Sequence, residues 1–93
     1  MKKIVTNAYI FNDMRDCRRM FAEVVEDTRY ETGHHIVTSR VIAVDAEKGY
    51  VQTESGTEYF VQKLLNKDEF IDYVKKTYDD ERAEYYLTYA NLK

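Results

Sequence analysis

The spacing of hydrophobic and polar positions changes several times along the chain, and each spacing predicts a different element. Residues 3–11 are rich in β-branched and aromatic side chains on both faces, which predicts a strand buried on both sides. Apolar residues then recur every three or four positions, starting at Met14, and a candidate N-cap, Asn12 or Asp13, precedes them. This spacing predicts an amphipathic helix over residues 13–28.

The middle of the chain has a two-residue period, which is typical of strands with one face on a core. Alternation over residues 35–44 predicts a strand, and residues 50–54 and 58–62 predict two more. The two segments between them, 46–49 and 54–57, each contain a glycine and predict tight turns. Because both connections are short, we expect the three strands to form an antiparallel meander.

The last third of the chain has a helical spacing that begins with a clear start signal. Asn66 and Glu69 have the spacing of a capping box, so a helix is expected to begin at residue 67. The pattern allows one long helix over 67–90 or two helices that meet at 77–80, with Thr77 as the cap of the second. The acidic pair Asp79 and Asp80 favours two helices, because carboxylates stabilise a helix N-terminus.

These elements together predict a single α+β domain over residues 1–93 with the order β-α-β-β-β-α. The expected architecture is a mostly antiparallel sheet of about four strands with helices packed on one side. A chain of 93 residues with one Cys has no internal disulfide, which suits a reducing cytoplasm. No apolar run is long enough to span a membrane, so we expect a cytoplasmic protein with no membrane contact.

Charge argues against direct binding of nucleic acid. The net charge is −3. The excess of negative charge lies after residue 46, where the sequence has ten acidic and seven basic side chains. A protein that binds nucleic acid usually carries a basic stripe that contacts phosphates, and the sequence has none. An acidic surface fits a basic protein partner better.

Four features suggest chemistry, but each has a simpler interpretation. His34 and His35 are adjacent on a strand and point to opposite faces, so one metal ion does not easily take both. Cys17 lies on the predicted apolar helix face and is interpreted as core filler. The 54–57 segment lacks the glycines of a phosphate loop, and the carboxylate pairs lie on predicted helix surfaces. We therefore expect no metal, no cofactor and no enzymatic activity.

The most unusual feature is a tract near the C-terminus that combines tyrosines with carboxylates. Tyrosine provides a large contact area at a low entropic cost and is enriched at interfaces. The same tyrosines could instead pack a helix onto the core, so both interpretations stay open. The candidate partner-binding residues are Tyr78, Asp79, Asp80, Glu81, Glu84, Tyr85, Tyr86 and Tyr89.

One resemblance concerns the central strands. The segments TSRVIAVD, from Thr38 to Asp45, and VQTESGTEY, from Val51 to Tyr59, look like a strand–turn–strand pattern found in small accessory proteins of phages and prophages. In size, acidity and tyrosine content the chain also resembles the anti-CRISPR class. That resemblance implies inhibition of an effector by covering its nucleic-acid-binding surface or by locking it, and it assigns no individual residue.

The leading hypothesis is a non-enzymatic inhibitor or modulator of a host defence protein, which itself would bind nucleic acid. The expected contact is the tyrosine and carboxylate tract, with the turns at 46–49 and 54–57 as secondary contacts. One alternative is a homo-oligomeric structural or accessory phage protein, such as a homodimer joined through the tyrosine stripe. Another is a protein that sequesters a nucleotide signal in a pocket between subunits, with Arg15, Arg18, Arg19 and the tyrosines as candidate contacts.

Overall fold

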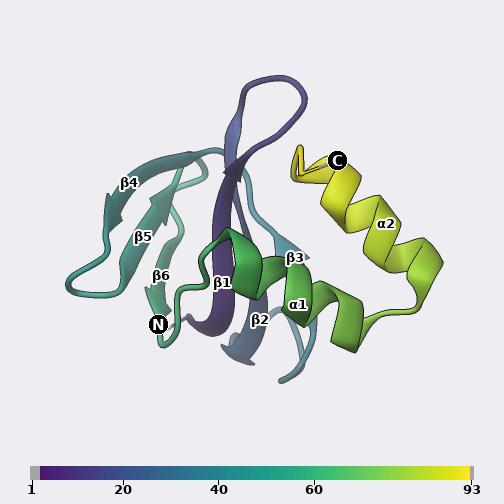
Figure 1. Ribbon diagram of the computed structural model, residues 1–93. Helices are drawn as coiled ribbons and strands as arrows, with labels where there is room; N and C mark the ends of the chain where they lie inside the picture. The colour runs from purple at the N-terminus through teal and green to yellow at the C-terminus, as the bar shows by residue number, and fades with distance from the viewer. Residues whose placement is uncertain (1–2, 93) are drawn as a thin grey trace.

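A computed structural model describes residues 3–92, which form six strands followed by two helices (Figure 1). The elements are β1 (Ile4–Asn12), β2 (Arg18–Glu26), β3 (His35–Val37), β4 (Val41–Asp45), β5 (Tyr50–Thr53), β6 (Glu58–Val61), α1 (Lys67–Thr77) and α2 (Asp80–Tyr89).

The strands form one mixed sheet with the order β3-β2-β1-β6-β5-β4. Neighbouring strands are antiparallel except β1 and β6, which pair in parallel at Ile4–Phe60 and Val5–Val61. The prediction of a single α+β domain is confirmed. The predicted sheet of about four mostly antiparallel strands is smaller than the observed sheet of six strands. The prediction also did not include the parallel pairing of β1 with β6 at the centre of the sheet.

The predicted helix over residues 13–28 is wrong, because most of this segment is β2. Its side chains are buried on both faces of the sheet: Met20, Ala22 and Val24 on one face, and Phe21 on the other. A strand with two buried faces has apolar residues at consecutive positions, and some of them recur by chance at helical spacing. The order β-α-β-β-β-α is therefore replaced by six strands and two helices.

Asp13 caps a hairpin and not a helix. Its Oδ1 accepts hydrogen bonds from the backbone N–H groups of Arg15 and Cys17, at 2.9 and 3.0 Å, and Oδ2 accepts one from Arg19 Nε at 2.8 Å. Asp16 has a positive φ of 60°, which closes the turn. An aspartate that accepts nearby amide groups stabilises a turn by the same chemistry as an N-cap, so the residue pattern alone favoured the wrong element. Cys17 is half-buried in this turn and lies outside the two cores.

The sheet curls, so that its two halves share a core on the concave face. Side chains of β4, β5 and β6 meet those of β2 there, in a cluster that contains Val5, Ala8, Met20, Ala22, Val24, Ile36, Val41, Val51 and Tyr59. A β-bulge in β1 adds to the irregularity of the sheet: Asn7 has a φ of 48°, and the register with β2 shifts between Thr6 and Tyr9. The alternation of side chains along β1 is interrupted at this point.

Both helices cover the other face of β1 and β2, as expected for helices on one side (Figure 1). They enclose a second core, which contains Phe11, Phe21, Leu65, Phe70, Val74, Ala83, Leu87 and Ala90. The capping box is confirmed, since Asn66 and Glu69 exchange hydrogen bonds of 3.0 and 2.8 Å. The two-helix alternative is also confirmed, with Asp79 and not Thr77 as the second cap.

The predicted strand over 35–44 is two strands that lie at opposite edges of the sheet. β3 pairs with β2, whereas β4 pairs with β5. The break follows Thr38, whose N–H still bonds to Met20 O while its hydroxyl accepts a hydrogen bond from Met20 N at 3.2 Å. The turns at 46–49 and 54–57 are confirmed, and both glycines have a positive φ.

Candidate functional site

The tyrosine and carboxylate tract forms α2 and the two extended residues that precede it. Asp79 is the N-cap of α2, because its side chain accepts a hydrogen bond from the backbone N–H of Arg82 at 2.8 Å. Asp80 and Glu81 lie in the first turn, where the helix dipole favours negative charge. These three carboxylates thus support the helix start, and all three side chains are exposed.

Three of the four tyrosines pack on the second core. Tyr78 and Tyr86 stack with their ring centroids 4.8 Å apart, and Tyr86 meets Phe21 edge-on at 5.5 Å. Burial raises the pKa of Tyr78 above its ordinary value, and interaction with Tyr86 raises it further. Tyr89 meets Phe11 edge-on at 5.7 Å. The packing interpretation therefore applies to Tyr78, Tyr86 and Tyr89, which are half-buried.

Tyr85 is different, because 61% of it is exposed. Its ring lies 5.3 Å from the ring of Tyr86 and 6.2 Å from that of Tyr89, so packed aromatic rings support it from below. A shallow surface depression of about 520 Å³ surrounds it, lined by Asp79, Glu81, Arg82, Tyr85 and Tyr86. The remaining candidates, Asp80 and Glu84, line a separate groove between α1 and α2 beside Lys75. The four carboxylates therefore divide between two sides of α2.

A residue that the sequence analysis placed in the core extends this surface. Met14 was expected on the buried face of a helix, but it lies in the β1–β2 turn and is 73% exposed. It lines a depression of about 350 Å³ with Asp13, Arg15, Arg19 and Tyr89. The C-terminal end of α2 lies close to this turn in Figure 1. We use the name Tyr85 surface for the set Met14, Asp79, Glu81, Tyr85 and Tyr89.

The three arginines suggested for a nucleotide are not gathered at one site. Arg15 and Arg19 line the depression beside Tyr89, whereas Arg18 lines another one with Arg40. Arg18 and Arg19 are neighbours on β2, and successive strand residues point to opposite faces. Arg19 is also engaged, since it bonds to Asp13 and donates to Thr38 O at 3.0 Å.

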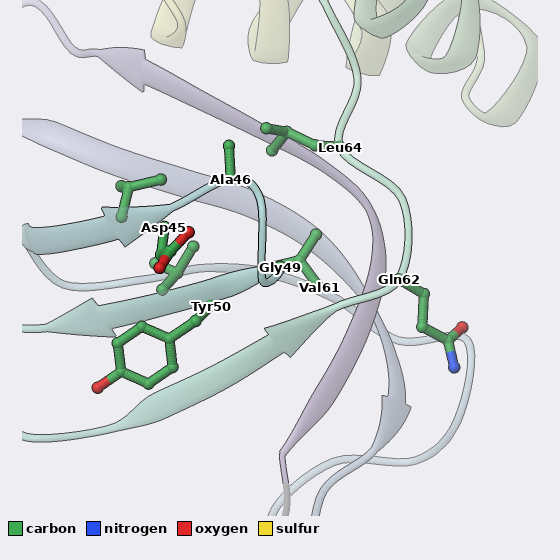
Figure 2. Close-up of a pocket in the computed structure, with 9 residues that line it drawn as sticks. Asp45, Ala46, Gly49, Tyr50, Val61, Gln62 and Leu64 are labelled. Atoms are coloured by element: carbon green, nitrogen blue, oxygen red, sulfur yellow. The ribbon is translucent and has the colours of Figure 1, made fainter.

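Figure 2 shows a cavity lined by β4, β5, the turn between them and the end of β6 with the segment after it. Its volume is about 110 Å³, whereas pockets for drug-sized ligands are usually about 300–1,000 Å³. Gly49 lies at this cavity with a φ of 66°, and a Cβ there would lie 2.6 Å from Val61 O. The cavity fits a few water molecules, and its shape does not suit a nucleotide.

A network of polar side chains that sequence analysis missed joins β1, β2, β3 and α1. Tyr73 Oη donates a 2.5 Å hydrogen bond to Glu23 Oε1 and lies 2.8 Å from His35 Nε2. Asn7, at the bulge, donates to the same Glu23 oxygen at 3.1 Å. Because the single hydroxyl proton points to Glu23, Nε2 of His35 must carry a proton and donate to Tyr73. No local sequence pattern links these four residues, since the fold alone brings them together.

Partial burial of this network shifts the pKa values of Tyr73 and His35. Burial raises the pKa of Tyr73, and the carboxylate of Glu23 raises it further. Burial lowers the pKa of His35, although Glu23 acts in the opposite direction. Both shifts favour neutral side chains, so at neutral pH the network has a neutral tyrosine and a neutral imidazole.

The two histidines contact different residues, as expected if their side chains point to opposite faces. His34 stacks on Tyr30, with ring centroids 5.4 Å apart, while His35 is held by Tyr73. Within residues 3–92, no group of three or more His, Cys, Asp or Glu side chains could hold a metal ion. No helix in the same range is long and apolar enough to cross a membrane.

Comparison with known proteins found no matching protein family, no similar curated protein and no similar solved structure.

Proposed function

We propose that this chain is a non-enzymatic binding protein that inhibits or modulates a host defence protein in the cytoplasm, and that it binds through the Tyr85 surface. The proposed partner is a protein that itself binds nucleic acid, so its contact face is basic. The choice of partner rests on the small size, acidity and tyrosine content that the chain shares with the anti-CRISPR class. The choice of surface rests on the geometry around Tyr85.

The exposure of Tyr85 is the observation that supports this surface most strongly. Tyrosine is among the residues enriched at binding hot spots, and an exposed tyrosine ring offers a partner a large contact area. At 61% exposure, Tyr85 is the most exposed tyrosine among the described large hydrophobic residues. Met14 adds a second exposed apolar side chain at the other end of the surface.

The support beneath Tyr85 favours binding energetically. Tyr86 and Tyr89 contact its ring, and Tyr86 in turn stacks on Tyr78. A side chain that is already restrained in the free protein loses less conformational entropy when a partner covers it. Asp79 and Glu81 lie at the edge of the same depression, where they can face basic side chains of a partner and speed association.

The experiment is affinity capture from a nuclease-treated bacterial host lysate, with three variants compared with the wild-type chain. Tyr85→Ala should lose the captured protein, because truncating a hot-spot tyrosine costs about 2 kcal/mol, or about 30-fold in affinity. Glu81→Lys should weaken capture at low salt, and its difference from the wild type should shrink as salt is added, because salt screens exposed charges. Tyr30→Ala removes a tyrosine that is 38% exposed elsewhere and should leave capture unchanged.

The proposal requires a stoichiometric protein whose capture depends on Tyr85. Equal capture by Tyr85→Ala and Tyr30→Ala would show that the partner binds another surface. Circular dichroism spectra of both variants exclude unfolding as the reason for a loss.

A further inference from the structure

The two ends of the Tyr85 surface differ in charge. At the β1–β2 turn, the depression of about 350 Å³ beside Tyr89 is lined by two arginines, Arg15 and Arg19, and by one carboxylate, Asp13. At the start of α2, the depression around Tyr85 is lined by two carboxylates and one arginine. The rings of Tyr85 and Tyr89 lie 6.2 Å apart and join the two depressions. The surface is therefore negative at one end and positive at the other.

Arg19 is held in position before any ligand binds. Its Nε donates to Asp13 Oδ2 at 2.8 Å, and its Nη1 donates to Thr38 O at 3.0 Å. A guanidinium has five N–H donors, so three of those of Arg19 have no partner among the described residues. The side chain is 29% exposed, and a restrained side chain loses little conformational entropy when a ligand binds to it.

Arg15 supplies a second guanidinium to the same depression. Its backbone N–H donates to Asp13 Oδ1 at 2.9 Å, which fixes its place in the turn, and the residue is exposed. Among the described residues, no ion pair or hydrogen bond engages its side chain. Asp16, the other carboxylate of the turn, lines a different depression together with Arg18.

The balance of charge in this depression indicates which anion it fits. Two guanidinium groups and one carboxylate leave a single positive charge, which matches a carboxylate better than a phosphate dianion. Arginine binds a carboxylate through two parallel hydrogen bonds. Met14 and Tyr89 complete the lining, where they can contact the methylene groups that carry a carboxylate. The carbonyl groups in the last turn of α2 accept hydrogen bonds from the N–H groups of residues 90–92, which weakens their repulsion of an anion.

We propose that Arg15 and Arg19 form a binding site for a carboxylate, which is an aspartate or glutamate side chain of the protein partner. This inference rests on the proposed function, because the site continues the Tyr85 surface. It adds a requirement to the chemistry of the partner, which has a basic group opposite Asp79 and Glu81 and an acidic group opposite the β1–β2 turn. The two contacts together fix the direction in which the partner lies along α2.

The first test needs no partner and uses acetate as the probe at about pH 8, where carboxylates are ionised. The CδH₂ signals of the arginines are followed by NMR while sodium acetate replaces sodium chloride at constant ionic strength, so that screening does not change. Charge-assisted hydrogen bonds predict saturating shifts at Arg15 and Arg19, with a dissociation constant of about 10–100 mM. Arg15→Gln should abolish the saturation. Arg18→Gln removes the same charge from the same hairpin and should keep it.

Absence of a saturating shift in the wild-type chain, or an equal loss in both variants, overturns the proposal. Inorganic phosphate, which is mainly a dianion at about pH 8, is the second probe. Acetate should saturate the site at a lower concentration than phosphate, because a dianion is repelled by Asp13. Tighter binding of phosphate would overturn the assignment to an acidic side chain and would indicate a phosphate group as the ligand.

The second test uses the captured partner and separates this inference from the proposed function. Arg15→Glu should lower the affinity about tenfold or more, since it removes a charge-assisted contact and repels the carboxylate of the partner. Arg18→Glu changes the net charge equally and should have a smaller effect. A partner face that is basic throughout would bind Arg15→Glu more tightly than the wild type. That result overturns the carboxylate site, whereas capture that depends on Tyr85 still supports the proposed function.

Discussion

Tyr73 is the residue whose loss tests the packing of the helices on the sheet most sharply. Its hydroxyl donates to Glu23 at 2.5 Å and accepts from His35 at 2.8 Å, so it ties α1 to two strands. The change Tyr73→Phe removes the hydroxyl and keeps the ring and its edge contact with Phe21 at 6.2 Å. The variant therefore isolates the contribution of the two hydrogen bonds.

The expected cost follows from the two partners. A hydrogen bond to a charged carboxylate contributes about 1.5–3 kcal/mol, and a neutral one about 0.5–1.5 kcal/mol. Glu23 keeps its bond from Asn7, and all four side chains of the network are half-buried, so water replaces part of the loss. We expect Tyr73→Phe to lower the free energy of unfolding by about 2 kcal/mol.

Urea unfolding followed by circular dichroism measures this change. With a urea m value of about 1–3 kcal/mol/M, a loss of 2 kcal/mol moves the midpoint down by about 0.7–2 M. In a chain of this size the melting temperature should fall by about 8–16 °C. Tyr85→Phe is the control, because its mostly exposed ring should change stability by less than about 0.5 kcal/mol. Equal midpoints for the two variants would refute the reasoning.

Three further predictions concern stability. Asp13→Ala removes the acceptor of two backbone N–H groups and one guanidinium, so thermal unfolding should occur at a lower temperature than in the wild type. Gly49→Ala should cost about 1–3 kcal/mol in urea unfolding, because φ is 66° and the added Cβ would lie 2.6 Å from Val61 O. Burial lowers the pKa of His35, so the unfolded chain takes up a proton below about pH 6.5 that the folded chain does not. Stability should therefore fall from pH 7 to pH 5, and His35→Gln should remove this slope.

The sequence predicted well those elements that local chemistry determines. The capping box at Asn66, the break before Asp79 and the two glycine turns all depend on residues close together in the chain, and all were confirmed. The α+β fold class was also predicted, because it depends on the chain having both segments with helical spacing and segments with strand spacing.

The sequence failed where tertiary pairing decides the structure. β2 is buried on both faces, so its apolar residues lost the two-residue period and matched a helix instead. The same error placed Met14 in the core, although it lies exposed at a hairpin turn. The parallel pairing of β1 with β6 joins residues more than fifty positions apart, and no local signal marks it.

The role of the candidate site stays a prediction, and the sequence indicated its place in the chain but not how its side chains divide. The tract over 78–89 does form one surface element, but its members separate into packed rings, a helix cap and one exposed tyrosine. Side-chain direction on a helix depends on where the helix lies on the core, which the sequence alone left open. The network of Glu23, Tyr73 and His35 was missed for the related reason that its residues come from three distant segments.

The central claim is that the Tyr85 surface binds a basic protein partner. The most direct measurement is the binding kinetics of the captured partner with wild-type chain, Tyr85→Ala and Glu81→Lys, at about 50 mM and about 300 mM salt, where screening differs strongly. We predict faster dissociation for Tyr85→Ala, and slower association for Glu81→Lys that is clearest at low salt. Rate constants that match the wild type for both variants would contradict the account.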